Sequence, residues 1–174
     1  MAQKNVIKAQ SEEAVNTTIE VLIKGGVIVY PTDTLYGLGA LVSQDDAVQR
    51  IFEIKGRNPD MSLPVLVKDF IMLEDYAHIP VKYAEMVREN MPGAFMAILR
   101  LKRELNPIIT GGKDTIGIRI SSNFFVTSLM KKLDEPLVST SANPSGRGNI
   151  YDITELIRVF GDKVDLIIDS GSIS

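Results

Sequence analysis

Short runs of apolar, largely β-branched residues alternate along this chain with segments whose apolar residues recur at helical spacing. The apolar runs predict strands at residues 27–30, 63–67, 95–101, 116–120, 137–138 and 164–168. The helical segments between them cover residues 11–24, 43–55, 80–91, 123–133 and 152–160. An alternation of this kind is typical of an α/β fold, and it predicts one sheet whose strands are parallel or mixed.

Residues at the predicted helix ends support these boundaries. Ser11 and Ser43 are candidate N-caps of the first two helices, and Pro80 fits the first turn of a third. Asp152 and Glu155 form a capping-box pattern before the last helix. We therefore expect five helices that pack on the sheet.

The length of 174 residues predicts one domain over residues 1–174. The chain contains no cysteine, which excludes disulfides, thiolate catalysis and zinc–sulfur sites. Its single histidine, His78, leaves no histidine cluster for a metal, so we expect no protein-held metal site.

The two ends of the chain lead to two expectations. The amino-terminal residues lack the apolar stretch of a signal peptide, and no apolar run reaches 18 residues, so we expect a cytoplasmic protein without a membrane span. The sequence stops at 169–174, directly after an apolar strand. We therefore expect either that a C-terminal closing segment is missing or that this is a short variant with an open site.

The charge distribution argues against a strong binder of nucleic acid. The net charge is −3, although residues 50–119 carry 11 basic and 9 acidic side chains and are positive by two. Aromatic residues, which stack on bases, make up 6% of the chain. A local basic groove remains compatible with these numbers.

Two common nucleotide-binding motifs are absent. The pair Gly37 and Gly39 lacks the third glycine of a dinucleotide fingerprint, because position 42 is Val. Lys113 follows Gly112 but is followed by Asp114, where a P-loop needs Ser or Thr. We instead expect the glycines at 37 and 39 to let a ligand approach the backbone closely, so that Gly39→Val would damage binding before stability.

Four polar segments lie at the ends of predicted strands. They cover residues 31–39, 55–57, 115–119 and 139–146. Each alone is explained by turn-forming hydroxyls or by a solvated helix end. In an open α/β sheet, however, ligands bind beyond the carboxyl ends of strands, and these segments would bring Lys55, Arg57 and Arg119 together with several hydroxyls. Such a group suits a polyanion such as a triphosphate, and it would catalyse by positioning reactants and neutralising charge.

The same segments resemble the YrdC-like threonylcarbamoyl-AMP synthases. The matching motifs are Tyr30-Pro-Thr-Asp-Thr-Leu-Tyr-Gly-Leu-Gly39, Ile51-Phe-Glu-Ile-Lys-Gly-Arg57, Asp114-Thr-Ile-Gly-Ile-Arg119 and Ser139-Thr-Ser-Ala-Asn-Pro-Ser-Gly146. The resemblance implies an α/β fold with a twisted, open, mixed sheet, packed helices and a large concave ligand groove.

The resemblance also implies a reaction. L-Threonine, bicarbonate and ATP, with Mg²⁺ as cofactor, would give threonylcarbamoyl-AMP and pyrophosphate, which makes the enzyme a nucleotidyltransferase. The product would serve the N6-threonylcarbamoyl modification (t6A) of adenosine 37 in tRNA. Partners would then include tRNA and the proteins that transfer the threonylcarbamoyl group to it.

The resemblance assigns residues to two binding regions and to catalysis. The ATP-binding positions are Lys55, Arg57, Thr115, Ser141, Asn143 and Asn149, of which Lys55, Arg57, Ser141 and Asn143 are the catalytic group. The threonine-binding positions are Thr34, Arg119 and Ser139, with Thr32 and Tyr36 shaping the same pocket. The chain departs from the family pattern at Met61, at Met96 and at Leu66, where some relatives carry a threonine-contacting His.

Two other functions remain open from the sequence. The chain could be a non-catalytic protein of the same fold that binds a nucleotide or structured RNA; salt-dependent tRNA binding without ATP turnover would then be observed. It could also be a carbamoyl-transfer module of the kind found in hydrogenase maturation proteins, although those proteins carry additional domains.

Overall fold

The computed structural model describes residues 5–173. The strands are β1 Val6–Lys8, β2 Ile28–Pro31, β3 Tyr36–Leu41, β4 Val65–Leu66, β5 Ala77–His78, β6 Ala97–Leu101, β7 Thr115–Arg119, β8 Leu137–Ser141 and β9 Leu166–Asp169. The helices are α1 Ala14–Ile23, α2 Asp45–Lys55, α3 Phe70–Tyr76, α4 Ala84–Asn90, α5 Pro107–Thr110, α6 Phe124–Lys131 and α7 Ile153–Phe160, with a 3₁₀ turn, η1, at Val81–Tyr83.

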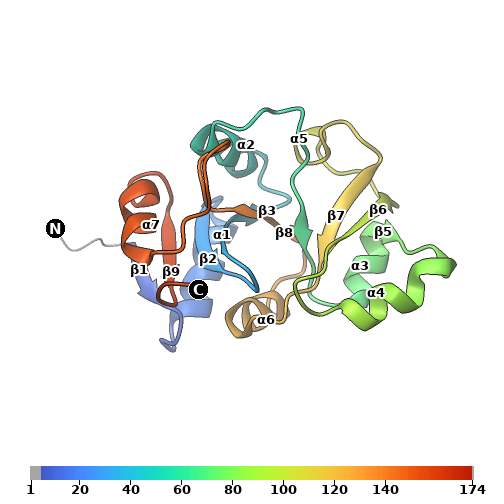
Figure 1. The fold of residues 1–174 in the computed structure, drawn as a ribbon, viewed down its shortest axis with the longest axis horizontal. Helices are drawn as coiled ribbons and strands as arrows, with labels where there is room; N and C mark the ends of the chain where they lie inside the picture. Colours follow the sequence, from blue (N-terminus) through green and yellow to red (C-terminus); the bar gives the residue numbers. More distant parts are fainter. Residues whose placement is uncertain (1–4, 174) are drawn as a thin grey trace.

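All nine of these strands form one mixed sheet, in the order β1-β9-β2-β3-β8-β4-β7-β6-β5. β1, β9 and β2 run parallel to one another, as do β4 and β7, whereas the remaining neighbours are antiparallel. Figure 1 shows the sheet twisting across the molecule, with β1 and β9 at one end and β5 and β6 at the other. The predicted α/β fold with a twisted mixed sheet and packed helices is confirmed.

Apolar side chains cover both faces of the sheet, because successive residues of a strand point to opposite sides. In β2, Val29 belongs to the core that contains α2 and α7, whereas Ile28 and Tyr30 belong to the core that contains α1 and α6. The apolar residues of α3 and α4 join the first core. Helices α2, α7, α3 and α4 therefore cover one face of the sheet along most of its length.

Helices cover only half of the opposite face. α1 and α6 pack against each other and contribute to a core with β2, β9 and the nearby parts of β3 and β8. On the same face of β7 and β6, residues such as Thr115, Gly117 and Ile98 are not buried by any described helix. This uncovered half of the sheet becomes the floor of the site described below.

Two predicted N-caps are wrong. α1 begins at Ala14, and Ser11 accepts the Ala14 N–H with its backbone carbonyl rather than its side chain. Ser43 lies before the start of α2, and both its N–H and its hydroxyl donate to the Glu135 carboxylate, at 2.9 and 3.0 Å. Tertiary partners therefore compete for short polar side chains that the local pattern assigns to a helix end.

The start of the third helix is also different from its prediction. Pro80 precedes the 3₁₀ turn η1, and the α-helix begins only at Ala84. In contrast, the Asp152 cap is confirmed, since its carboxylate accepts the Glu155 N–H at 2.9 Å. None of the helices among residues 5–173 is long and apolar enough to cross a membrane.

The segment that contains Gly37 and Gly39 is a buried strand, β3, rather than a polar strand end. A Cβ at Gly39 would lie 2.7 Å from Cε1 of Tyr30 and 3.1 Å from the backbone oxygen of Val138. The missing side chain therefore makes room for the Tyr30 ring and not for a ligand. The expectation that Gly39→Val damages binding before stability is revised on this ground.

Candidate functional site

A cavity of about 450 Å³ lies over the uncovered half of the sheet, between the β2–β3 loop and the end of α2. Its floor follows from the alternation of β7: Ile116 and Ile118 enter the core, while Thr115, Gly117 and Arg119 face the other side. A Cβ at Gly117 would lie 3.0 Å from the sulfur of Met96, so the absence of a side chain at this position leaves space in the cavity above β7. Strand periodicity thus places polar groups in a row along the cavity.

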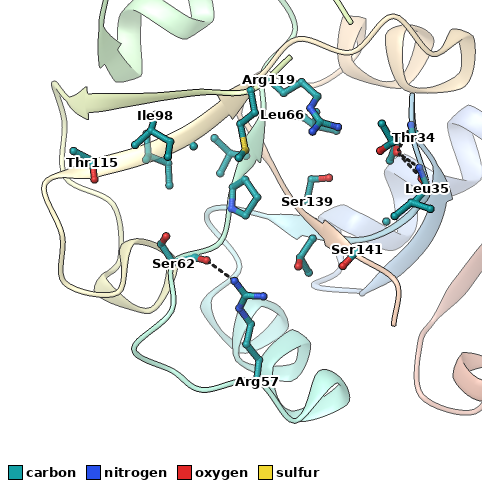
Figure 2. A pocket seen from close by; sticks show the side chains of 18 of the residues that line it. Thr34, Leu35, Arg57, Ser62, Leu66, Ile98, Thr115, Arg119, Ser139 and Ser141 are labelled. Carbon is teal, nitrogen blue, oxygen red and sulfur yellow. Dashed lines mark hydrogen bonds between the residues drawn. The ribbon is translucent and has the colours of Figure 1, made fainter. Parts of the chain in front are cut away.

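One end of the cavity is formed by Arg119, Thr34 and Ser139 (Figure 2). Within residues 5–173, the Arg119 guanidinium has no ion-pair partner, and its buried Nε has no hydrogen-bond partner. A buried donor without a partner is costly, and an incoming acceptor removes that cost. This end of the cavity is therefore suited to a carboxylate.

Ser139 is held in place from behind. The hydroxyl of the fully buried Tyr30 donates to Ser139 Oγ at 2.6 Å. Burial raises the pKa of Tyr30 well above its ordinary value, although the hydrogen bond to Ser139 opposes the shift. Tyr30 therefore remains a neutral donor, which leaves the Ser139 hydroxyl proton free to face the cavity.

The opposite end is formed by Arg57, Ser62 and Ser141 (Figure 2). Arg57 follows the C-terminus of α2, where Gly56 adopts a left-handed conformation and turns the chain. Its Nη2 donates to the Ser62 carbonyl at 2.9 Å, while its Nε is buried without a partner in the described part of the chain. Burial also lowers the pKa of the Arg57 guanidinium, which shows that its charge is poorly compensated. A bound anion would compensate this charge and pair with the free Nε, so this end too is suited to an anion.

Lys55 and Asn143 lie behind Ser141 rather than in the cavity wall. The Lys55 ammonium donates to the carbonyls of Ser141 and Asn143 at 2.6 and 2.7 Å. Burial, followed by the charge of Arg57, lowers the pKa of Lys55 to about 8. Ser141 Oγ in turn donates to Asn143 Oδ1 at 2.6 Å. This network fixes the loop after β8.

The structure brings most of the predicted site residues into one cavity. The lining includes Thr32, Thr34, Tyr36, Arg57, Thr115, Arg119, Ser139 and Ser141. Asn149 is exposed outside it, where its amide lies 3.4 Å from the Tyr151 hydroxyl. Tyr36 contributes to the wall, but its hydroxyl donates to the Gly171 carbonyl at 2.7 Å.

The sequence reasoning missed several residues of the wall. These are Ser62, Pro64, Ile98 and Lys113, of which Ile98 is 71% exposed; Met96, singled out above as a departure from the family pattern, also lines the cavity. The alternation of β6 contains a signal for Ile98, because its neighbours Ala97 and Leu99 are buried. No local pattern points to Ser62 or Lys113, since both reach the cavity from loops.

The wall provides guanidinium groups at two ends, an ammonium at Lys113 and several hydroxyls. Among the described lining residues, none is Asp or Glu, and residues 5–173 contain no group of three or more metal-ligating side chains. The arrangement can bind a molecule with an anionic group at each end and hold it by hydrogen bonds between them.

Comparisons with known proteins agree on one family. A family model named for Sua5, YciO and YrdC and described as "Telomere recombination" matches residues 20–174. The threonylcarbamoyl-AMP synthase of Halorhodospira halophila is 32% identical over 148 residues, which are 84% of this chain and 78% of the relative.

Two solved structures share the fold closely. P. abyssi Sua5 complexed with L-threonine has a TM-score of 0.87 at 30% identity and covers 97% of this chain. E. coli YciO has the same TM-score and identity, with 98% of this chain and 84% of that chain covered. The present chain spans about half the length of the P. abyssi protein, at 50%.

Proposed function

This chain belongs to the Sua5, YciO and YrdC family, and from that premise we propose that it is an L-threonylcarbamoyl-AMP synthase. The enzyme would join L-threonine, bicarbonate and ATP into threonylcarbamoyl-AMP and release pyrophosphate and water. The name of the H. halophila relative and the L-threonine complex of Sua5 support this activity over a non-catalytic nucleotide or RNA binder.

The observation that carries the proposal is a single cavity with an under-bonded guanidinium at each end. In the proposed assignment, Arg119 binds the threonine carboxylate, and Thr34 and Ser139 provide hydrogen bonds beside it. Thr32 and Tyr36 shape the same end of the cavity. Arg57, Thr115 and Ser141 bind the nucleotide and its phosphates, because guanidinium and hydroxyl groups are suited to phosphate oxygens. The Ser141 hydroxyl would turn from Asn143 toward the ligand to do so.

Lys55 and Asn143 would act on ATP mainly through Ser141, because both bond to that residue or to its loop. The Lys55 ammonium also adds positive charge behind the phosphates. Asn149 would reach ATP only if its loop moves toward the cavity. We propose that Mg²⁺ arrives with ATP, since magnesium usually binds substrate phosphates and keeps several waters.

The proposed reaction needs protection from water. The threonine amine and bicarbonate form a carbamate with loss of water, and a carbamate oxygen must then attack the α-phosphorus and displace pyrophosphate before the carbamate decomposes. The threonine carboxylate and the phosphates therefore have to be held in one cavity. We further propose that the product passes to proteins that modify tRNA, and that the protein works in the cytoplasm, where ATP and tRNA are present.

Pyrophosphate release tests the proposal. The chain is incubated with ATP and Mg²⁺, with and without L-threonine and bicarbonate, and the nucleotide product is identified by mass. We expect release only with both co-substrates and a product of the mass of threonylcarbamoyl-AMP. Arg57→Ala should reduce the rate at least about tenfold, as loss of a charged hydrogen bond does. Arg158→Ala removes an exposed arginine paired with Glu155 and serves as the matched control.

ATP binding without any turnover would favour the non-catalytic binder. Equal rates for wild-type and Arg57→Ala protein would contradict the assignment of this residue.

A further inference from the structure

A second network lies immediately behind the Arg119 end of the cavity. The Asp33 carboxylate, in the loop between β2 and β3, accepts hydrogen bonds from both hydroxyls of Ser121 and Ser122, at 2.6 Å each. The Ser122 N–H donates to the same carboxylate at 2.9 Å. Three donors from two adjacent residues therefore hold one carboxylate.

The donors come from the chain segment that also carries Arg119. Arg119 ends β7, and Ser121 follows it by two residues. Asp33 lies directly before Thr34, which Figure 2 shows on the same side of the cavity as Arg119. The serine bonds thus join the two loops that flank the proposed carboxylate-binding end.

The positive charge of Arg119 also acts on the Asp33 carboxylate. Burial by itself would raise the pKa of Asp33, but the hydrogen bonds from Ser121 and Ser122, with the positive charge of Arg119, lower it below its ordinary value. Asp33 is therefore an anion at neutral pH. Yet no Asp33–Arg119 ion pair exists among the described residues.

Neighbouring opposite charges in a partly buried place normally pair, and a bidentate arginine–carboxylate contact is the favoured geometry. Here three hydrogen bonds fix the Asp33 carboxylate against Ser121 and Ser122, and in that position it makes no contact with Arg119. Arg119 in turn keeps a buried Nε without a partner. Arg119 thus has no carboxylate partner among the described residues, and the carboxylate of a substrate could take that place.

We propose that Ser121 and Ser122 hold the Asp33 carboxylate away from Arg119, which keeps Arg119 available for the carboxylate of the amino-acid substrate. Asp33 would otherwise occupy Arg119 as an internal competitor. The two serines are positioning residues, because they act on Arg119 through Asp33. This inference rests on the proposed binding of L-threonine at Arg119.

The competition has a simple quantitative consequence. If loss of both hydroxyls lets Asp33 occupy Arg119 for about nine-tenths of the time, only about one-tenth of the protein can bind substrate, and the apparent Kd rises about tenfold. ATP does not contact Arg119 in the proposed assignment. The effect should therefore appear in the Kd and KM for L-threonine and not in the KM for ATP.

Calorimetric titration of the whole chain with L-threonine tests the inference. We expect the S121A/S122A variant to bind about tenfold more weakly than the wild-type protein. Ser43→Ala is the matched control, because Ser43 also donates its hydroxyl and N–H to one carboxylate, that of Glu135, away from the cavity. Its Kd should stay within about twofold of wild type.

A third variant separates competition from simple loss of structure. Adding Asp33→Asn to S121A/S122A removes the competing charge, and the Kd should return to within about threefold of wild type. Melting temperatures of all variants report whether each is folded.

An unchanged Kd in S121A/S122A would overturn the inference, and so would a weakened Kd that Asp33→Asn does not restore. Failure of the wild-type protein to bind L-threonine would instead overturn the proposed function, and the inference with it.

Discussion

Gly39→Ala should destabilise the protein although it adds only one methyl group. The new Cβ would lie 2.7 Å from Cε1 of Tyr30, which is closer than two carbon atoms can approach. Tyr30 has little freedom to move, because it is fully buried and its hydroxyl bonds to Ser139. On the other side, the backbone oxygen of Val138 lies 3.1 Å from the same Cβ.

The magnitude follows from the cost of overpacking a dense core. An extra methyl group that displaces buried neighbours typically costs about 1–3 kcal/mol. For a chain of this length, each kcal/mol lowers Tm by about 2–4 °C, so a cost of about 2 kcal/mol predicts a Tm lower by about 4–8 °C. A shifted Tyr30 ring would also displace the Ser139 hydroxyl and weaken L-threonine binding.

Urea and thermal unfolding followed by circular dichroism measure this effect, and calorimetry measures threonine binding. Gly148→Ala is the control, because residue 148 is exposed and no atom lies within 4 Å of the position that its new methyl group would take. Gly39→Ala protein with wild-type stability would refute the reasoning. Weaker threonine binding at unchanged Tm would instead restore the view that Gly39 faces the ligand.

Three further predictions concern stability. Val29→Asp places a charge in the core, where Val29 is fully buried, and should abolish the cooperative thermal transition that the exposed Met86→Asp control retains. Asp152→Ala removes the cap of α7 and should cost about 1 kcal/mol in urea unfolding, whereas a cost near zero would show that the cap is dispensable. Burial lowers the pKa of Lys55 to about 8, against 10.5 in the unfolded chain. Between these pH values the unfolded chain binds one more proton than the folded protein, so the unfolding free energy should rise with pH. The Lys55→Met variant should lack this rise. Parallel pH profiles for the two proteins would contradict the assigned pKa.

The sequence predicted the sheet strands best where periodicity and composition agreed. The runs at β2, β6, β7 and β9 were recognised within a few residues, because buried β-branched residues leave a clear pattern. β1, β5, α3 and α5 were missed; β1, β5 and α5 have two to four residues each, too few for a period to show. β3 was misread as a polar strand end, and only the structure shows that Gly39 makes room for Tyr30 whereas Gly37 lines the cavity.

For the candidate site, too, local motifs predicted some features and missed others. The motifs identified Arg57, Arg119, Ser139 and Ser141, and the structure places all four in one cavity. They did not show that Lys55 lies behind the wall, because the partners of a lysine are decided by the loop that folds over it.

What the sequence alone determined is the type of fold and the chemical character of the site. Strand and helix periods are local, and each polar motif lies within a few adjacent residues. What the tertiary structure decided is which groups remain free to bind. Asp33 and Arg119 are 86 positions apart in sequence, and whether they pair depends on Ser121 and Ser122, which reach the same carboxylate only after the two loops meet. Competition between partners is a property of distances in space, so no local pattern contains it.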